Sequence, residues 1–279
     1  MNKQYRKQIE QILIDNEIYT AKQMKTVYKT QKQALKVLEE RLGALFIKYG
    51  VNGTLKMTSK QKAGIGLKQI LKTMAKDLGT SEIAVMTSIL GEVYLESYYK
   101  NAFLLNTKFN IVKKEFVDAA VNQKFKGSLF SKRIWINKAD MIDKLQTNLT
   151  DAMKGKTTID KVARDIKNTF NVKAYESKRL VNTEMSRIQT QASYDIGIDS
   201  GVDEVMWSAT LDNLTATDDA DLDGIVWGIK ENHPTPPLHP NCRCTLINVP
   251  YKGWQPTSRK DNISKEVIDY KSYNEWKNK

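Results

Sequence analysis

The chain has 279 residues, of which 41% are hydrophobic and 27% are charged, and its formal net charge is +12 at pH 7. This balance is typical of a globular protein and excludes a chain that is disordered throughout. No apolar run approaches the roughly 18 residues that span a bilayer, so we expect no membrane span. The polar N-terminus lacks the apolar core of a signal peptide, which predicts a protein made and retained in a cytoplasm.

The charge is unevenly distributed along the chain. Residues 1–180 contain 34 Lys and Arg against 17 Asp and Glu, whereas residues 201–240 contain one Lys against eight acids. A basic region therefore precedes an acidic segment, which predicts two regions with different roles. The excess of positive charge favours a polyanionic or acidic partner, although it fixes only the sign of that partner's charge.

Hydrophobic residues recur at helical intervals in the first part of the chain. We expect a break at Gly79, after which Ser81 would cap the next helix. The stretch 106–130 is mixed and predicts only loose helical structure. The helices expected before it cover residues 3–48, about 60–77 and 81–104.

A second group of helices is expected further along the chain. Thr157 and Asp160 have the spacing of a capping box, so Thr157 is expected to begin one of these helices. Gly197 and Gly201 are expected to end the last one. The three helices cover residues 139–153, 157–170 and about 174–196.

Past Gly201 the hydrophobic period changes from helical to alternating, as in half-buried strands. Short strands are expected at 205–209, 225–227 and 245–249. The sequence thus predicts the α+β class, with a mainly helical N-terminal region followed by a small mixed C-terminal module that has a few short strands. The expected domains are a basic helical region at 1–130, a module at 131–250 with helices at 139–196 and strands at 203–250, and a tail at 251–279.

The segment from His239 to Cys244 combines residue types that bind zinc. It lacks the second cysteine pair of a zinc finger. The alternative is that Cys242 and Cys244 are small buried residues at the start of a strand, while His239 hydrogen-bonds the loop. The candidates for a fourth ligand are His233, Asp212 and Asp219, and the predicted set is His239, Cys242, Cys244 and Asp219 for zinc or another divalent cation.

The segment from Asp219 to Gly224 has acids at its first, third and fifth positions and glycine at its sixth, as in the first half of an EF-hand loop. The closing twelfth position falls on Lys230, and a strand rather than a helix is expected to follow. An irregular cation site and a solvated turn with Asp side chains capping backbone N–H groups therefore remain as interpretations.

The Asp, His and Cys residues of these two segments are also residue types that nucleases and thiol hydrolases use for catalysis. A cysteine nucleophile needs a histidine held by a third group. Both histidines, His233 and His239, lie in one Pro-rich loop, where that geometry is hard to build. We therefore predict no catalytic residue, and a metal-dependent hydrolase or toxin-like module using the Asp loop, His239 and Cys242 is the alternative.

Lys68, Lys72 and Lys76 share one face of an expected helix and are candidates for contact with DNA phosphates. The alternative is that they form the solvated face of an amphipathic helix. The sequence has no Gly-rich phosphate loop and no base-reading motif, so any DNA contact is expected to be non-specific.

Four segments of the second half carry distinctive motifs: Gly-Lys-Thr-Thr at 155–158, Leu-Val-Asn-Thr-Glu at 180–184, a stretch from Trp207 to Gly224, and Pro-Pro-Leu-His-Pro-Asn-Cys-Arg-Cys at 236–244. Together they resemble phage head-morphogenesis proteins of the Mu F-like minor capsid family. A Tyr-x-x-Trp motif at 273–276 is a weaker similarity. The residues that carry the resemblance are Thr183, Glu184, Trp207, Asp212, Asp223, Gly224, His239, Pro240, Cys242, Arg243 and Cys244.

The sequence departs from this family at several positions. Asn182 and Leu214 stand where the family has arginine, and Asp219 stands where it often has His or Cys. If the family site binds a metal, a carboxylate here replaces a soft ligand, which favours a harder cation.

The resemblance implies a non-enzymatic minor capsid protein that assists head assembly or the packaging and ejection of DNA. It implies the portal protein and capsid or scaffold proteins as partners, together with non-specific DNA contact. It also implies a location in the bacterial host cytoplasm during assembly and afterwards in the virion, inside the head near the portal.

Overall fold

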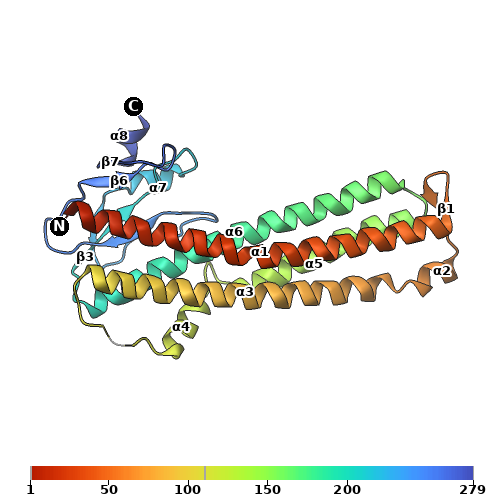
Figure 1. Ribbon diagram of the computed structural model, residues 1–279, viewed down its shortest axis with the longest axis horizontal. Coiled ribbons are helices and arrows are strands. Elements are labelled where there is room, and N and C mark those ends of the chain that lie inside the picture. Colours follow the sequence, from red (N-terminus) through yellow and green to blue (C-terminus); the bar gives the residue numbers. More distant parts are fainter. Residues whose placement is uncertain (1, 110, 279) are drawn as a thin grey trace. The chain divides into compact units, whose positions relative to one another are not determined.

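The computed structural model describes residues 2–109 and 111–278 (Figure 1). Helices make up 63% of it, and the short antiparallel strands of its C-terminal part confirm the α+β class. No helix within the described residues combines the length and the apolar character needed to cross a bilayer. The helices are α1 (Asn2–Tyr49), α2 (Ser59–Gly64), α3 (Leu67–Leu104), α4 (Lys114–Val121), α5 (Phe130–Met153), α6 (Ile159–Asp199), α7 (Thr217–Asp221) and α8 (Tyr273–Lys277). The strands are β1 (Gly50–Val51), β2 (Thr54–Leu55), β3 (Glu204–Ser208), β4 (Val226–Gly228), β5 (Thr245–Asn248), β6 (Ser258–Lys260) and β7 (Val267–Asp269).

The contacts group the chain into two units, and α1, α3 and α6 contribute residues to both. We call them the helical unit (Gln23–Met86 and Lys124–Lys178) and the mixed unit (Met1–Lys22, Thr87–Gln123 and Arg179–Lys279). Each unit thus consists of segments that lie far apart in the sequence but contact one another in the fold. The sequential domain boundaries expected at residues 130 and 250 stay predictions.

The expected break at Gly79 is wrong, because α3 continues through this residue. A Cβ atom built on Gly79 would lie 2.4 Å from the ring of Trp135 on α5. The glycine therefore lets an aromatic ring approach the helix backbone closely, and it does not end the helix. The helix expected at residues 3–48 is confirmed by α1.

The helices expected at 157–170 and 174–196 form one continuous helix, α6. Its first turn is capped by Thr158, whose Oγ1 accepts a hydrogen bond from the backbone N–H of Lys161 at 3.4 Å. The predicted cap at Thr157 is therefore displaced by one residue. Two further boundaries differ. The helix α5 begins at Phe130 rather than at 139, and among the described residues of 106–129 the helical ones are those of α4.

The helical unit is built around apolar side chains that α1, α3, α5 and α6 contribute at helical spacing. One ion pair is buried in this unit: Lys138 Nζ lies 2.5 Å from Glu82 Oε2, and the two side chains are 2% and 1% exposed. Such a pair offsets its desolvation cost only while both partners are present. The core residues are Leu38, Leu42, Leu55, Leu71, Leu78, Met141, Leu145, Leu149, Ala152, Met153, Val162, Ile166 and Phe170.

The mixed unit contains a three-stranded antiparallel sheet in the order β4-β3-β5, which confirms the three expected strands. Val205 in the central strand lies opposite Trp227 on one side and Asn248 on the other. The first turns of α1 pack on the same unit, where the Tyr5 hydroxyl donates to the carbonyl oxygen of Asn248 at 2.9 Å. The first and the last segments of the chain therefore belong to the same unit.

The segment 251–279, expected as a tail, carries β6, β7 and α8. Tyr273 and Trp276 of α8 are buried in the same core as Trp207 of β3. Alternation did not reveal these strands, because β6 and β7 have only three residues each.

We expect Lys138→Ala to lower the free energy of unfolding by about 3–5 kcal/mol, because Glu82 would stay buried without its partner. Lys144→Ala is the matched control on the same helix. Lys144 pairs with Asp140 at 2.9 Å, but its side chain is 52% exposed, so we expect its unfolding midpoint to stay close to that of the wild type. Urea unfolding followed by circular dichroism measures both, and equal losses would contradict a structural role for the buried pair.

Candidate functional site

One face of α6 holds the His-Pro-Asn-Cys-Arg-Cys segment in place. Thr183 Oγ1 accepts a hydrogen bond from the backbone N–H of Asn241 at 2.8 Å. The Ser186 hydroxyl donates to the carbonyl oxygen of Cys244 at 3.3 Å, and Asn182 Nδ2 donates to Asn241 Oδ1 at 3.0 Å. Two of these bonds meet at Asn241, whose φ of 68° places it in the left-handed region that asparagine tolerates. The turn before Cys242 is therefore fixed by the helix.

Glu184, the next residue of the same motif, serves a different contact. Its buried carboxylate accepts from Arg187 Nε at 2.8 Å. Arg187 in turn donates to the carbonyl oxygens of Ala120 at 2.9 Å and Val121 at 3.3 Å, at the C-terminal end of α4. Because successive helix residues are about 100° apart around the axis, adjacent motif residues reach two different neighbours.

An ion pair joins two loops of the mixed unit. We call residues 212–224 the Asp loop and residues 239–244 the cysteine segment. Asp212 Oδ2 lies 2.5 Å from Arg243 Nη2, and Asp212 Oδ1 accepts from the backbone N–H of Leu214 at 2.8 Å. The Thr210 hydroxyl donates to the carbonyl oxygen of Arg243 at 2.8 Å. The start of the loop is therefore fixed to the middle of the Cys-Arg-Cys sequence.

The three alternating acids of this loop have different partners. Asp219 faces His239, Asp223 pairs with Arg259, and the side chain of Asp221 is exposed. The chain then turns at Gly224, where φ is +82°, a left-handed conformation that favours glycine. A strand follows, as expected, and the acids do not converge as they would in an EF-hand loop.

Asp219, His239 and Cys242 come together from two segments. His239 Nε2 lies 2.7 Å from Asp219 Oδ2, and Cys242 Sγ lies 3.5 Å from the same oxygen. The three ligand atoms are all within 4.8 Å of one another. Asp219 and Cys242 are each 1% exposed, whereas the His239 side chain is 35% exposed. Three of the four predicted metal ligands are thus neighbours in space.

The fourth predicted ligand, Cys244, is buried but does not belong to this group among the described residues. A hydrogen bond from the Cys244 thiol lowers the pKa of Cys242, against the opposing effect of burial. The same bond, together with burial, raises the pKa of Cys244. Metal binding itself stays a prediction.

Opposing effects act on the imidazole of His239. Burial lowers its pKa. The hydrogen bonds with the carbonyl oxygen of Pro240 and the carboxylate of Asp219 together outweigh burial, so the pKa lies above the ordinary value for histidine. The ring is thus held from both sides, by its own segment and by α7.

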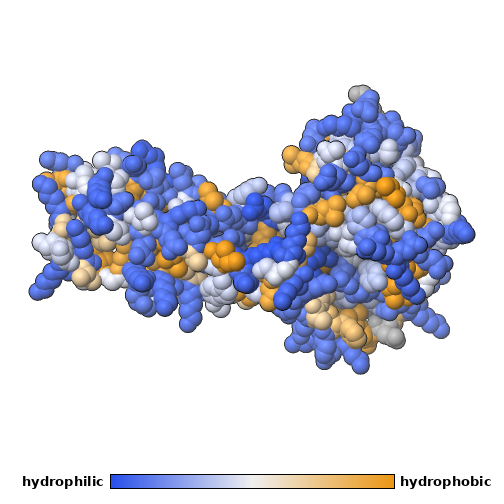
Figure 2. All heavy atoms as spheres, turned by 180° about the vertical axis from the view of Figure 1, so that it is seen from behind, coloured by the Kyte–Doolittle hydropathy of each residue, from blue (hydrophilic) through white to orange (hydrophobic). Residues whose placement is uncertain are grey.

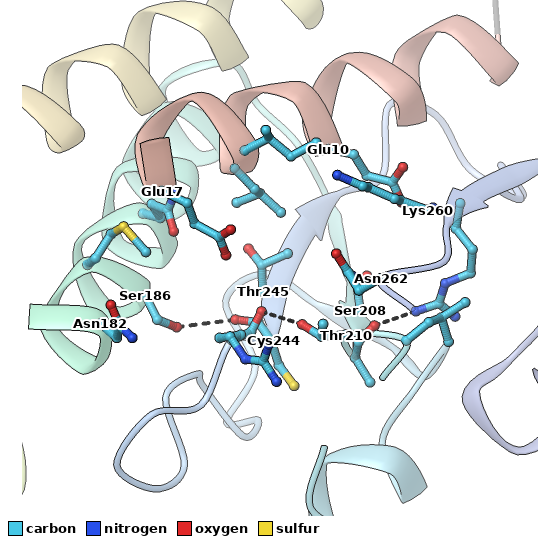
Figure 3. A pocket seen from close by; sticks show the side chains of 18 of the residues that line it. Glu10, Glu17, Asn182, Ser186, Ser208, Thr210, Cys244, Thr245, Lys260 and Asn262 are labelled. Atoms are coloured by element: carbon cyan, nitrogen blue, oxygen red, sulfur yellow. Dashed lines mark hydrogen bonds between the residues drawn. The ribbon is translucent and has the colours of Figure 1, made fainter. Parts of the chain in front are cut away.

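A polar cavity of about 130 Å³ lies beside these contacts (Figure 3). Glu17 reaches toward it from α1, and burial raises the pKa of this carboxyl group. Arg6 Nη2 donates to Ser208 Oγ at 2.6 Å in the same wall, and Ser186 and Cys244 contribute the bond described above. Basic side chains predominate in the lining, which contains two acidic residues, Glu10 and Glu17, and five basic ones, Arg6, Arg243, Arg259, Lys260 and Lys265.

Comparison with known proteins shows two matches to phage head proteins. Residues 143–247 match the family described as Phage Mu protein F like protein. Minor head protein GP7 of Bacillus phage SPP1 is 24% identical in an alignment that covers 94% of this chain and 94% of that protein. These two matches support a Mu F-like minor head protein. Its role is in head morphogenesis, as a minor component of the virion.

A second relative is named NAD(+)–arginine ADP-ribosyltransferase EFV and comes from Enterococcus faecalis. It is 28% identical over 205 residues, which cover 65% of this chain. The chain spans 42% of the length of that enzyme, so the activity in the name is that of a longer protein. No solved structure matches the chain.

The Mu F-like match ends at residue 247 and so leaves out Arg259, a site residue that the sequence analysis missed. Arg259 Nη1 lies 2.6 Å from Asp223 Oδ2, and both side chains are 1% exposed. Asp223 also accepts from the backbone N–H groups of Ala209 at 2.8 Å and Tyr273 at 2.7 Å. The sequence indicated Asp223 as a motif residue, but nothing near Arg259 marked it as the partner.

Asp223→Ala is expected to lower the free energy of unfolding by about 3–5 kcal/mol, because Arg259 would be buried without a counter-charge. Asp221→Ala removes an exposed acid two residues away, and we expect a change within about 0.5 kcal/mol. Guanidinium unfolding followed by tryptophan fluorescence compares the two. Equal midpoints for both variants would show that Asp223 does not hold this unit together.

Proposed function

We propose that this Mu F-like minor head protein acts without catalysis, by docking on the portal and the inner capsid and by contacting DNA non-specifically. The main support is the alignment with minor head protein GP7, which extends over 94% of both chains. A correspondence along nearly the whole length favours a shared role of the whole protein rather than of one module. On this proposal the protein lies inside the head near the portal.

An apolar surface of the mixed unit supports docking on another protein. Ile111 is 88% exposed and Phe116 is 63% exposed, and both line a groove that also contains Tyr94 and Tyr98. Figure 2 shows apolar surface in this part of the molecule, near α4. Exposed apolar patches on soluble proteins mark contact sites for partners. We assign this groove to the portal or to a neighbouring capsid protein.

The helical unit supports contact with DNA. Lys68, Lys72 and Lys76 are exposed along α3, as the helical spacing predicted. The face of this unit drawn in Figure 2 is largely hydrophilic. Lysines on such a face can neutralise phosphates without reading bases, which matches the non-specific contact proposed here.

We expect wild-type protein to co-sediment with procapsids that contain the portal, and the double variant Ile111→Ser/Phe116→Ser to bind about tenfold more weakly, because its apolar contact area is lost. The matched control is Ile47→Ser/Ile136→Ser, which removes two exposed isoleucines from the helical unit. If the groove variant binds procapsids as tightly as the wild type, the assignment of this groove to the portal or a capsid protein is wrong.

For DNA, we expect the slope of log K against log salt to become shallower by about 0.9 for each lost phosphate contact in Lys68→Gln/Lys72→Gln/Lys76→Gln. The control Lys22→Gln/Lys25→Gln/Lys29→Gln removes the same charge from exposed positions on α1. Fluorescence anisotropy with duplex DNA over a range of salt concentrations measures both slopes. If the two triple variants have the same slope, α3 is not the DNA-binding face.

The same preparations test the absence of catalysis. Plasmid incubated with the protein and Mg²⁺, Mn²⁺ or Zn²⁺ should stay intact, and NAD⁺ should not be consumed. Plasmid cleavage that disappears in His239→Ala would establish the metal-dependent hydrolase instead.

A further inference from the structure

Asp219, His239 and Cys242 have no role in the docking and DNA contacts proposed above. Within residues 2–109 and 111–278, they are the one group of three His, Cys, Asp or Glu side chains close enough to share an ion. No lysine or arginine in that part of the chain forms an ion pair with Asp219, although its carboxylate is buried. A buried carboxylate without a cationic partner is costly, so a positive species is expected beside it.

The orientation of His239 indicates where that positive species lies. Its Nδ1 is 3.0 Å from the carbonyl oxygen of Pro240, which can only accept a hydrogen bond, so Nδ1 carries the hydrogen. In a neutral imidazole the lone pair is then on Nε2, which faces Asp219 Oδ2 at 2.7 Å. His239 Nε2 and Asp219 Oδ2 would then be two hydrogen-bond acceptors facing each other. This arrangement is unfavourable unless a proton or a metal ion lies between them. Metal-binding histidines commonly donate their second N–H to a backbone carbonyl in this way.

The position of Cys242 favours a metal ion over a proton between His239 and Asp219. Cys242 Sγ lies 3.5 Å and 3.7 Å from the two carboxylate oxygens of Asp219. Sulfur and oxygen ligands bound tetrahedrally to zinc at their usual bond lengths are about 3.5 Å apart. The Cys242 thiol therefore contacts the same carboxylate that faces His239, so three ligand atoms of types that zinc binds converge on one place. The contact between His239 and Asp219 needs to widen to about 3.3 Å for both to bind one ion.

We propose that Asp219, His239 and Cys242 bind a zinc ion that joins α7 to the segment after Pro240. Thiolate and imidazole ligands favour zinc over magnesium or calcium. The exposed side of His239 gives the ion access and leaves the fourth position to solvent. Cys244 is buried outside this group and is not a ligand in this proposal.

The proposal replaces the four-ligand set expected from the sequence, and it does not depend on the portal or on DNA. The ion would join segments about 20 residues apart in the sequence, so its binding would stabilise the folded protein.

We expect the 279-residue protein, loaded with zinc and dialysed, to retain about one zinc per chain by elemental analysis. Asp219→Asn, His239→Asn and Cys242→Ser should each lose it, whereas Cys244→Ser should keep it. His233→Asn is the matched control, because His233 Nδ1 makes the same contact with the carbonyl oxygen of Pro234 at 2.9 Å but has no place in the cluster. Cobalt loading should give a thiolate-to-cobalt absorption band in wild type and in Cys244→Ser, but not in Cys242→Ser.

Wild-type protein that retains no zinc, or a His239→Asn variant that retains as much as His233→Asn, would overturn the proposal. Loss of zinc by Cys244→Ser to the same extent as by Cys242→Ser would overturn the three-ligand set. If a ligand variant does not fold, the wild type decides: its unfolding temperature should rise with added zinc and not with magnesium, and no rise with zinc rejects the site.

Discussion

The buried carboxylate of Asp223 joins three segments that lie far apart in the sequence. It binds the end of β3 through Ala209, the strand β6 through Arg259, and the start of α8 through Tyr273. Because Arg259 and Asp223 are both removed from water, neither can lose its partner without leaving an uncompensated charge. The end of the Asp loop is therefore fixed, and Asp212 fixes its beginning through Arg243. The short helix α7 between them is held at both ends, which brings Asp219 to His239.

The long helix α6 provides the surface on which this arrangement rests. Its Thr183 and Ser186 bind the backbone of the cysteine segment, and its Glu184 positions Arg187 against the end of α4. The family motif thus marks a junction between α6, the segment His239–Cys244 and the end of α4. Apolar residues that follow α3 and begin α4 are exposed beside it, so the junction and the proposed docking groove belong to the same unit. This suits a protein whose work is contact with other proteins.

The two units differ in chemistry in the way that the charge distribution suggested. The helical unit carries the exposed lysines of α3, whereas the mixed unit contains the acidic segment and the apolar groove. In the proposed function, one unit faces DNA and the other faces protein.

Local patterns in the sequence determined the fold class, the course of α1 and the three strands of the sheet, because hydrophobic periodicity depends on neighbouring residues alone. They also indicated the motif residues, and three of the four predicted metal ligands lie together. Tertiary structure decided the rest. Gly79 does not break α3, because the absence of a side chain lets the ring of Trp135 pack against the helix there. Arg259 is the partner of Asp223 although 36 residues separate them. Cys244, only two residues from Cys242, lies outside the cluster. These outcomes depend on which side chains meet across the core, and spacing along the chain carries no information about that.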